Sequence, residues 1–281
     1  MIPQDFDYTA PATLSEALEL LKNGEAKVLA GGMSLIPLMK LRLAAPERVV
    51  DLGRIAELNY IREDGGSIRV GAMTTHFQIE SSAMLKARCP LLAEAASAIG
   101  DVQVRNMGTI GGSIAHADPA ADYPASLLAL EARLKLAKAG SERTVAIGDF
   151  LQDTFTTALE PGEIVTEISV PVEQSGTGVS YQKMLQPASG FAIVGVAARI
   201  RRAGGRIAMA RIGVTGLAWK AFRATAAEQL LEGGADVRAA VAGIAEGVQA
   251  NADIHASAEY RKHMAAVYAA RAVSAALSRA S

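Results

Sequence analysis

One polar stretch, VPVEQSGTGVS at residues 170–180, divides the chain into two parts of different character. It combines Pro, Ser and Gly without apolar periodicity, which is typical of a linker. Before it, short strand-like runs alternate with helical runs, whereas after it three strand-like runs are followed only by helical ones. The sequence therefore predicts an α+β protein with two domains, at residues 1–175 and 178–281.

The first domain is itself predicted in two pieces. Residues 5–52 contain short strand patterns around a helix capped by Thr13, and a second short helix opened by Ser34, so a small βαβ-like subdomain covers about residues 1–55. A hairpin signal at Gly65-Gly66 begins a larger mixed-sheet subdomain, about residues 56–175, whose helices restart after Pro90. Both pieces are expected to belong to one ligand-binding domain.

The second domain is predicted as a sheet followed by helices. Three strand patterns, VSYQKML, FAIVGVAARIRR and GRIAMARIGVTG, form a three-stranded antiparallel sheet with a turn at Gly204-Gly205. The remaining residues are Ala-rich with apolar residues at helical spacing, which indicates a small packed bundle.

Charge and composition exclude several classes of partner and cofactor. The 281 residues carry 28 basic and 29 acidic side chains, a net charge of -1, so a nucleic-acid or anionic-membrane binder is not indicated. No segment approaches the roughly 20 apolar residues of a membrane span and no secretory signal is visible, so we expect a cytoplasmic protein. A single cysteine, Cys89, cannot hold an iron–sulfur cluster or form an internal disulfide.

Two glycine pairs stand out, in LAGGMS at residues 29–34 and in GTIGGS at residues 108–113. Consecutive glycines bring backbone N–H groups close to a ligand without an intervening Cβ, and such groups can form a nest for an anion. Each pair alone is more often a simple turn. Together, each expected at the end of a strand and beside hydroxyl residues, they predict a clamp that holds a diphosphate through backbone N–H groups.

Several common nucleotide-binding and catalytic motifs are absent from the sequence. There is no G-x-G-x-x-G, no G-x-x-x-x-G-K-[ST], no H-E-x-x-H and no G-x-S-x-G, and the four histidines lack metal-ligand spacing. We therefore predict no catalytic side chain and no metal site in this chain.

Five segments carry a resemblance to a known family: AGGMSLIPLMKLRLAAPERVVDLGRI, IRVGAMTTH, VQVRNMGTIGGSIAHADPAADYPA, TALEPGEIVTEISVP and SAEYRKHMAAVYAARAV. Together they resemble the FAD-binding medium subunit of molybdenum hydroxylases of the carbon monoxide dehydrogenase type, which is similar to the flavin domain of xanthine dehydrogenase. The resemblance implies a two-subdomain FAD-binding fold of the vanillyl-alcohol-oxidase (PCMH) class, followed by a three-stranded sheet and helical bundle.

The resemblance also implies which residues bind FAD. It assigns two diphosphate loops, a polar contact, a residue packed near the flavin and a lysine that closes over the cofactor: Leu29, Ala30, Gly31, Gly32, Met33, Ser34 and Leu35; Thr109, Ile110, Gly111, Gly112 and Ser113; Asp122; Val165; and Lys183. Met33 stands where relatives often carry His or Gln, so it is expected to contribute its backbone. Judged by residue type alone, Asp122 is more often a turn former and Lys183 a solvated strand residue.

We interpret several neighbouring residues as structural and not as ligands of FAD. Asp118 is expected to form a turn, His116 to hydrogen-bond within its loop, and Cys89 to pack as a small apolar residue. Arg105 and Asn106 precede the second glycine pair, and the sequence leaves open whether they brace it or face a partner.

The implied function is electron transfer within a heterotrimer, doubled to a dimer of heterotrimers. FAD in this chain would collect electrons from two [2Fe–2S] clusters of a small subunit, while a large subunit with a molybdopterin cofactor hydroxylates the substrate. A stand-alone FAD-dependent oxidoreductase and a flavin-free scaffold remain as alternatives. Carbon monoxide, purines, N-heteroaromatics and aldehydes stay open as substrates, and quinone, oxygen and NAD as acceptors.

Overall fold

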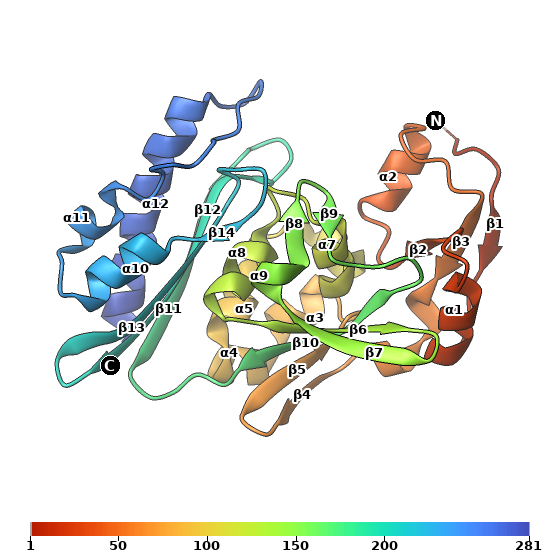
Figure 1. Cartoon of the computed structure of the whole chain (residues 1–281), viewed down its shortest axis with the longest axis horizontal. Helices are drawn as coiled ribbons and strands as arrows, with labels where there is room; N and C mark the ends of the chain where they lie inside the picture. Colours follow the sequence, from red (N-terminus) through yellow and green to blue (C-terminus); the bar gives the residue numbers. More distant parts are fainter. Residues whose placement is uncertain (1, 281) are drawn as a thin grey trace.

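The computed structural model describes residues 2–280, which form three units side by side (Figure 1). A small N-terminal sheet, a larger central sheet with its helices, and a C-terminal sheet with its helices follow one another in space as they do in sequence. Within residues 2–280 no helix has the length and apolarity required to cross a membrane.

The N-terminal unit is a three-stranded parallel sheet in the order β1-β3-β2. Its elements are β1 (Asp7–Thr9), α1 (Leu14–Leu21), β2 (Lys27–Leu29), α2 (Leu35–Lys40) and β3 (Arg48–Asp51), followed by two 3-10 turns, η1 (Leu52–Arg54) and η2 (Ala56–Leu58). Thr13 caps α1 as predicted, because its Oγ1 accepts the Glu16 N–H at 3.2 Å. Ala17 and Leu21 on the inner face of α1 pack into a core with Val50.

The central unit is a five-stranded antiparallel sheet in the order β4-β5-β10-β6-β7. The strands are β4 (Ile61–Asp64), β5 (Ser67–Gly71), β6 (Arg133–Lys138), β7 (Ser141–Ala146) and β10 (Ile164–Pro171), beside a small pair formed by β8 (Leu151–Asp153) and β9 (Thr156–Thr157). The hairpin predicted at Gly65 and Gly66 is confirmed: both residues have positive φ, +58° and +78°, in the turn between β4 and β5.

Seven helices accompany the central sheet: α3 (His76–Ser81), α4 (Ala83–Arg88), α5 (Pro90–Ser97), α6 (Val102–Met107), α7 (Ile110–His116), α8 (Asp122–Ala129) and α9 (Ile147–Phe150). Helix α5 restarts at Pro90 as predicted, with the proline in its first turn, where a missing N–H costs nothing. Residues of α8, including the fully buried Tyr123 and Leu127, belong to the same core as the central sheet.

The C-terminal unit contains one more strand than predicted. Its elements are β11 (Thr177–Leu185), β12 (Ala192–Ala203), β13 (Arg206–Thr215), β14 (Phe222–Arg223), α10 (Thr225–Glu232), α11 (Val237–Ala242) and α12 (Ala258–Arg279). The three long antiparallel strands are those predicted, whereas β14 pairs with β13 over two residues only and is too short to show an alternating pattern. Helix α12 packs across β11 and β12, and α8 of the central unit packs against β12 and β13. Helix α8 therefore joins the central and C-terminal units.

Candidate functional site

The first glycine pair lies in the turn between β2, which ends at Leu29, and α2, which begins at Leu35. Gly32 adopts a φ of +75°, a conformation that disfavours any side chain. Within residues 2–280, four consecutive N–H groups of this turn have no hydrogen-bond acceptor: those of Gly31, Gly32, Met33 and Ser34. Such a run of free amides is suited to an anionic ligand.

The second glycine pair does not follow a strand, and that expectation is wrong. Gly111 and Gly112 lie in the first turn of α7, directly after α6. Thr109 caps this helix, because its Oγ1 accepts the Gly112 N–H at 3.2 Å. The Gly111 N–H donates to the Ala72 carbonyl oxygen at 2.9 Å, and a Cβ on Gly111 would lie 2.5 Å from the Ala72 Cβ. These two amides are already engaged, so bonds from them to a diphosphate would have to replace existing ones.

The two glycine segments meet in space. A Cβ on Gly31 would overlap the Met107 carbonyl oxygen and lie 2.7 Å from the Gly108 Cα. A Cβ on Gly112 would lie 3.3 Å from the Ala30 Cβ. The absence of side chains thus allows the turn after β2 to press directly against the start of α7. In Figure 1, α2 belongs to the N-terminal unit and α7 to the neighbouring central unit.

The residues at this junction fit the diphosphate of FAD. The free amides of the first turn supply donors, and the hydroxyls of Ser34 and Ser113 have no hydrogen-bond partner within residues 2–280. Both hydroxyls are partly exposed, so they can reach a ligand. The first turn therefore offers backbone donors, and the second segment offers a hydroxyl and a surface without side chains.

His76 holds the second glycine segment in place by a hydrogen bond to Gly108, a role that the sequence did not suggest. Its backbone N–H donates to the Gly108 carbonyl oxygen at 2.9 Å, and its Nδ1 lies 3.2 Å from the Tyr123 hydroxyl. The ring is buried, with 4% exposure. Burial, aided by the nearby charge of Arg105, lowers the pKa of His76 to about 4, so this histidine is neutral at pH 7.

The buried neutral His76 predicts acid sensitivity. Its pKa in the folded chain lies below the ordinary 6.5 of the unfolded chain, so its contribution to stability is complete above pH 6.5 and is lost as pH falls toward 4. We expect this group to remove up to about 3 kcal/mol of unfolding free energy over that range. Urea unfolding of wild type and His76→Gln between pH 4.5 and 7 measures the difference.

A matched control is His263→Gln, because His263 is exposed on α12. The stability advantage of wild type over the His76 variant should shrink with acid, while the advantage over the His263 variant stays constant. Equal pH profiles for wild type and His76→Gln would contradict this account of His76.

Asp122 and Lys183 form a buried ion pair that connects the two domains. Asp122 begins α8 and Lys183 lies on β11, and their side chains are 5% and 6% exposed with 2.9 Å between Oδ2 and Nζ. The Tyr181 hydroxyl donates to Asp122 Oδ1 at 2.5 Å, and Lys183 Nζ also donates to the Ala98 carbonyl oxygen at 2.8 Å. Tyr181 was not predicted, although it lies two residues before Lys183 and therefore on the same face of the strand.

The electrostatics of this cluster depend on burial. Burial raises the pKa of Asp122 to about 6, while the charge of Lys183 and the hydrogen bonds from Tyr181 and Lys183 oppose the rise. Burial and the neighbouring Asp122 carboxylate raise the pKa of Tyr181 well above its ordinary value. The cluster is therefore a proton-sensitive link between the domains.

The segment between α7 and α8 is also held by the second domain. Asp118 forms the predicted turn, because its Oδ1 accepts the Ala120 N–H at 2.8 Å. The Thr215 hydroxyl lies 2.9 Å from the Pro119 carbonyl oxygen and 2.7 Å from the Ala121 carbonyl oxygen. These contacts fix the start of α8, and with it the position of Asp122.

Val165 lies on a strand that is linked to the second glycine pair through the backbone. It is buried on β10 with 5% exposure. The carbonyl oxygen of its neighbour Thr166 accepts the Ala72 N–H at 3.0 Å, and the Ala72 carbonyl oxygen in turn accepts the Gly111 N–H. Its implied position near the flavin remains a prediction.

Arg105 braces helix α6, which precedes the second glycine pair. Its Nε donates to Glu80 Oε2 at 2.8 Å and its Nη1 to the Ile99 carbonyl oxygen at 3.0 Å. These bonds anchor α6 to α3 and to the chain before it. Asn106 is exposed on the same helix.

His116 was expected to hydrogen-bond within a loop, but it lies at the end of helix α7 and its ring forms no hydrogen bond within residues 2–280. His116 and Cys89 both have packing roles. The His116 ring lies 4.9 Å from the Phe155 ring between centroids, and burial lowers the pKa of His116. Cys89 is fully buried, as expected for a small packed residue, and burial raises the pKa of its thiol to about 12.

The fold and the site define the class of protein, and comparison with known families agrees. Residues 4–173 match the family described as FAD binding domain in molybdopterin dehydrogenase, and residues 179–276 match the CO dehydrogenase flavoprotein C-terminal domain. The chain therefore belongs to the FAD-binding molybdopterin dehydrogenase family. This confirms the fold class and the family that the sequence resemblance implied, and the chain is an oxidoreductase flavin subunit with an FAD-binding domain.

Individual relatives support the assignment over the full length. The carbon monoxide dehydrogenase medium chain of Hydrogenophaga pseudoflava is 42% identical, with 99% of each chain covered. A solved carbon monoxide dehydrogenase from the same organism, which lacks the Mo-pyranopterin moiety of its molybdenum cofactor, superposes with a TM-score of 0.97 at 43% identity, with 100% of each chain covered. Quinoline 2-oxidoreductase from Pseudomonas putida 86 gives a TM-score of 0.94 at 32% identity, covering 100% of this chain and 99% of that chain.

Proposed function

We propose that this chain is the electron-transfer subunit of a heterotrimeric molybdenum hydroxylase. It takes electrons from [2Fe–2S] clusters on a small subunit and passes them to an external acceptor, while a large subunit with a molybdopterin cofactor oxidises the substrate. A dimer of such heterotrimers is the expected assembly. The observation that carries the proposal is the free amides of Gly31, Gly32, Met33 and Ser34, pressed against the α7 segment in a chain of this family.

The residues of this chain have binding and positioning roles. Bound FAD supplies the conversion between single-electron and paired-electron steps. The turn after β2 binds the diphosphate, Ser34 and Ser113 add hydroxyl donors, and Lys183 with Asp122 holds the second domain against the first. None of these groups has to act as a nucleophile.

In this proposal the substrate binds to the large partner subunit. Relatives named for carbon monoxide and for quinoline share this fold at TM-scores of 0.97 and 0.94. A flavin subunit whose fold is so nearly the same in enzymes of different substrates is not expected to select the substrate. The external acceptor is likewise left open.

Purification of the native assembly tests the proposal. We expect this chain to copurify with a cysteine-rich small subunit and a large subunit, with one FAD per copy of this chain together with iron and molybdenum. A stable native assembly with FAD but neither iron nor molybdenum would favour a stand-alone FAD-dependent oxidoreductase. A complete assembly without FAD would indicate a flavin-free scaffold.

A further inference from the structure

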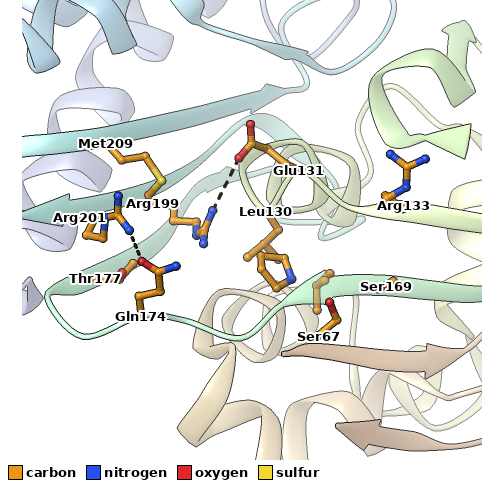
Figure 2. A pocket seen from close by; sticks show the side chains of 12 residues that line it. Ser67, Leu130, Glu131, Arg133, Ser169, Gln174, Thr177, Arg199, Arg201 and Met209 are labelled. Carbon is orange, nitrogen blue, oxygen red and sulfur yellow. Dashed lines mark hydrogen bonds and ion pairs between the residues drawn. The ribbon is translucent and has the colours of Figure 1, made fainter. Parts of the chain in front are cut away.

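A groove of about 350 Å³ opens where the central and C-terminal units meet (Figure 2). It lies beyond the C-terminal end of α8, whereas Asp122 lies at the N-terminal end of that helix. We call it the junction groove and define it by six of the polar residues that line it: Ser67, Arg133, Ser169, Thr177, Arg199 and Arg201. Glu131 and Gln174 line it as well. Of the six, the first three come from the central sheet and the last three from the C-terminal sheet. Its volume lies within the range of small-molecule sites.

Arg199 is the buried cation of the junction groove. Its side chain is 9% exposed, and its Nε lies 2.9 Å from both carboxylate oxygens of Glu173. The distance from its Nη1 to Glu131 Oε2 is longer, at 3.9 Å. Glu131 also forms ion pairs with Arg211 and Arg223, at 3.1 Å each. Arg211 and Arg223 also pair with Glu232 and Glu228, so the charges of this cluster are balanced. The Nη groups of Arg199 form no hydrogen bond within residues 2–280 and are therefore available to a ligand.

Two further cations lack a carboxylate partner. Arg201 hydrogen-bonds to the neutral Gln174, and Arg133 has no ion pair with any residue in the part of the chain that the structure describes. Figure 2 shows Arg199 and Arg201 at one end of the groove and Arg133 at the other, with Leu130 and Glu131 between them. An anion that occupies the groove would meet guanidinium groups from both domains.

Hydroxyl groups without partners add donors to this cationic surface. The Thr177 Oγ1 is buried and has no hydrogen-bond partner in the described chain. Across residues 2–280, no side-chain hydrogen bond of Ser67 or Ser169 is formed either. The Thr177 oxygen is enclosed by protein, whereas Ser67 and Ser169 are half-buried, so the two serine hydroxyls are the donors that a ligand in the groove can reach.

We propose that the junction groove binds a small polyanion, a polycarboxylate or a phosphate compound with at least two negative charges. Arg201 and the free N–H groups of Arg199 receive one acidic group, and Arg133 with the two serines receives the other. Guanidinium groups recognise carboxylate and phosphate oxygens through paired N–H donors. The ligand thereby bridges the two domains.

Titration calorimetry of the full chain saturated with FAD tests this site, because FAD occupies the cofactor diphosphate site. The probes are citrate and inorganic pyrophosphate, with acetate at equal ionic strength as the singly charged control. We expect one site per chain, with acetate at least about tenfold weaker than the better probe. Tighter binding of citrate identifies a polycarboxylate site, and tighter binding of pyrophosphate a phosphate site.

Variants assign the binding to the groove. Arg201→Gln and Arg133→Gln, from opposite ends, should each weaken the better probe by about tenfold, whereas Arg238→Gln on the exposed surface of α11 should stay within about twofold. Melting temperatures close to wild type show that the variants fold. Binding that is unchanged in both groove variants, or no saturable binding of either probe, overturns the proposal.

Discussion

Replacement of Gly31 by alanine is expected to weaken FAD binding by about 10- to 100-fold while the chain still folds. The added methyl group would overlap the Met107 carbonyl oxygen and lie 2.7 Å from the Gly108 Cα, both of them backbone atoms that cannot rotate away. Relief of such overpacking costs about 1–3 kcal/mol, and here it must separate the two glycine segments. Equilibrium titration with FAD, followed by flavin fluorescence, measures the loss.

Gly148→Ala provides the matched control for this prediction. Its new Cβ would lie 3.8 Å from the nearest side-chain atom, Leu128 Cδ2, which is an ordinary contact. FAD affinity should stay at the wild-type value in this variant. An affinity of Gly31→Ala equal to that of Gly148→Ala would show that contact between the two glycine segments is not required for FAD binding.

Replacement of Lys183 by methionine should lower the unfolding free energy of the chain by about 3–5 kcal/mol at pH 7. The change leaves the Asp122 carboxylate buried with only the Tyr181 hydroxyl to stabilise its charge. Removal of one partner from a buried ion pair is costly because the other charge stays uncompensated. Urea unfolding without added FAD measures the effect without a contribution from cofactor binding.

The deficit of Lys183→Met should depend on pH in a defined direction. Burial already raises the pKa of Asp122 to about 6, and loss of Lys183 raises it further. In wild type the buried Asp122 also holds its proton up to about pH 6, so the deficit is smallest and constant below pH 6. It increases by about 1.4 kcal/mol per pH unit between pH 6 and the higher folded-state pKa of the variant. A deficit that is constant between pH 5 and 8 would contradict this explanation.

A double variant separates charge from packing. Asp122→Asn combined with Lys183→Met removes the unpaired carboxylate, so it should recover at least about half of the loss caused by Lys183→Met alone. If the two single losses simply add, the residues are not energetically coupled.

The regular elements could be predicted because each depends on local pattern. Thr13 before an apolar helical run and Gly65-Gly66 between two alternating runs identify a helix start and a hairpin without information from elsewhere in the chain. The position of Gly111 could not be predicted in this way. Its place in a helix depends on the Ala72 carbonyl oxygen, which comes from a distant part of the sequence.

The candidate site was only partly visible in the sequence for the same reason. Asp122 and Lys183 were assigned through family resemblance, and residue type alone favoured a turn and a solvated strand position. Their burial results from the packing of β11 against the central unit, a contact between domains. Tyr181 could have been found from its period-two spacing to Lys183, whereas His76 offered no signal before its contacts with Gly108 and Tyr123 were known.

The most direct test of the central claim is electron transfer into the flavin of this chain. The chain is loaded with FAD, mixed without oxygen with small and large subunits whose clusters have been reduced, and followed by the loss of oxidised-flavin absorbance. The proposed function predicts rapid bleaching that requires the small subunit. A flavin that stays oxidised in the assembled complex, or a chain that retains no FAD there, would contradict it.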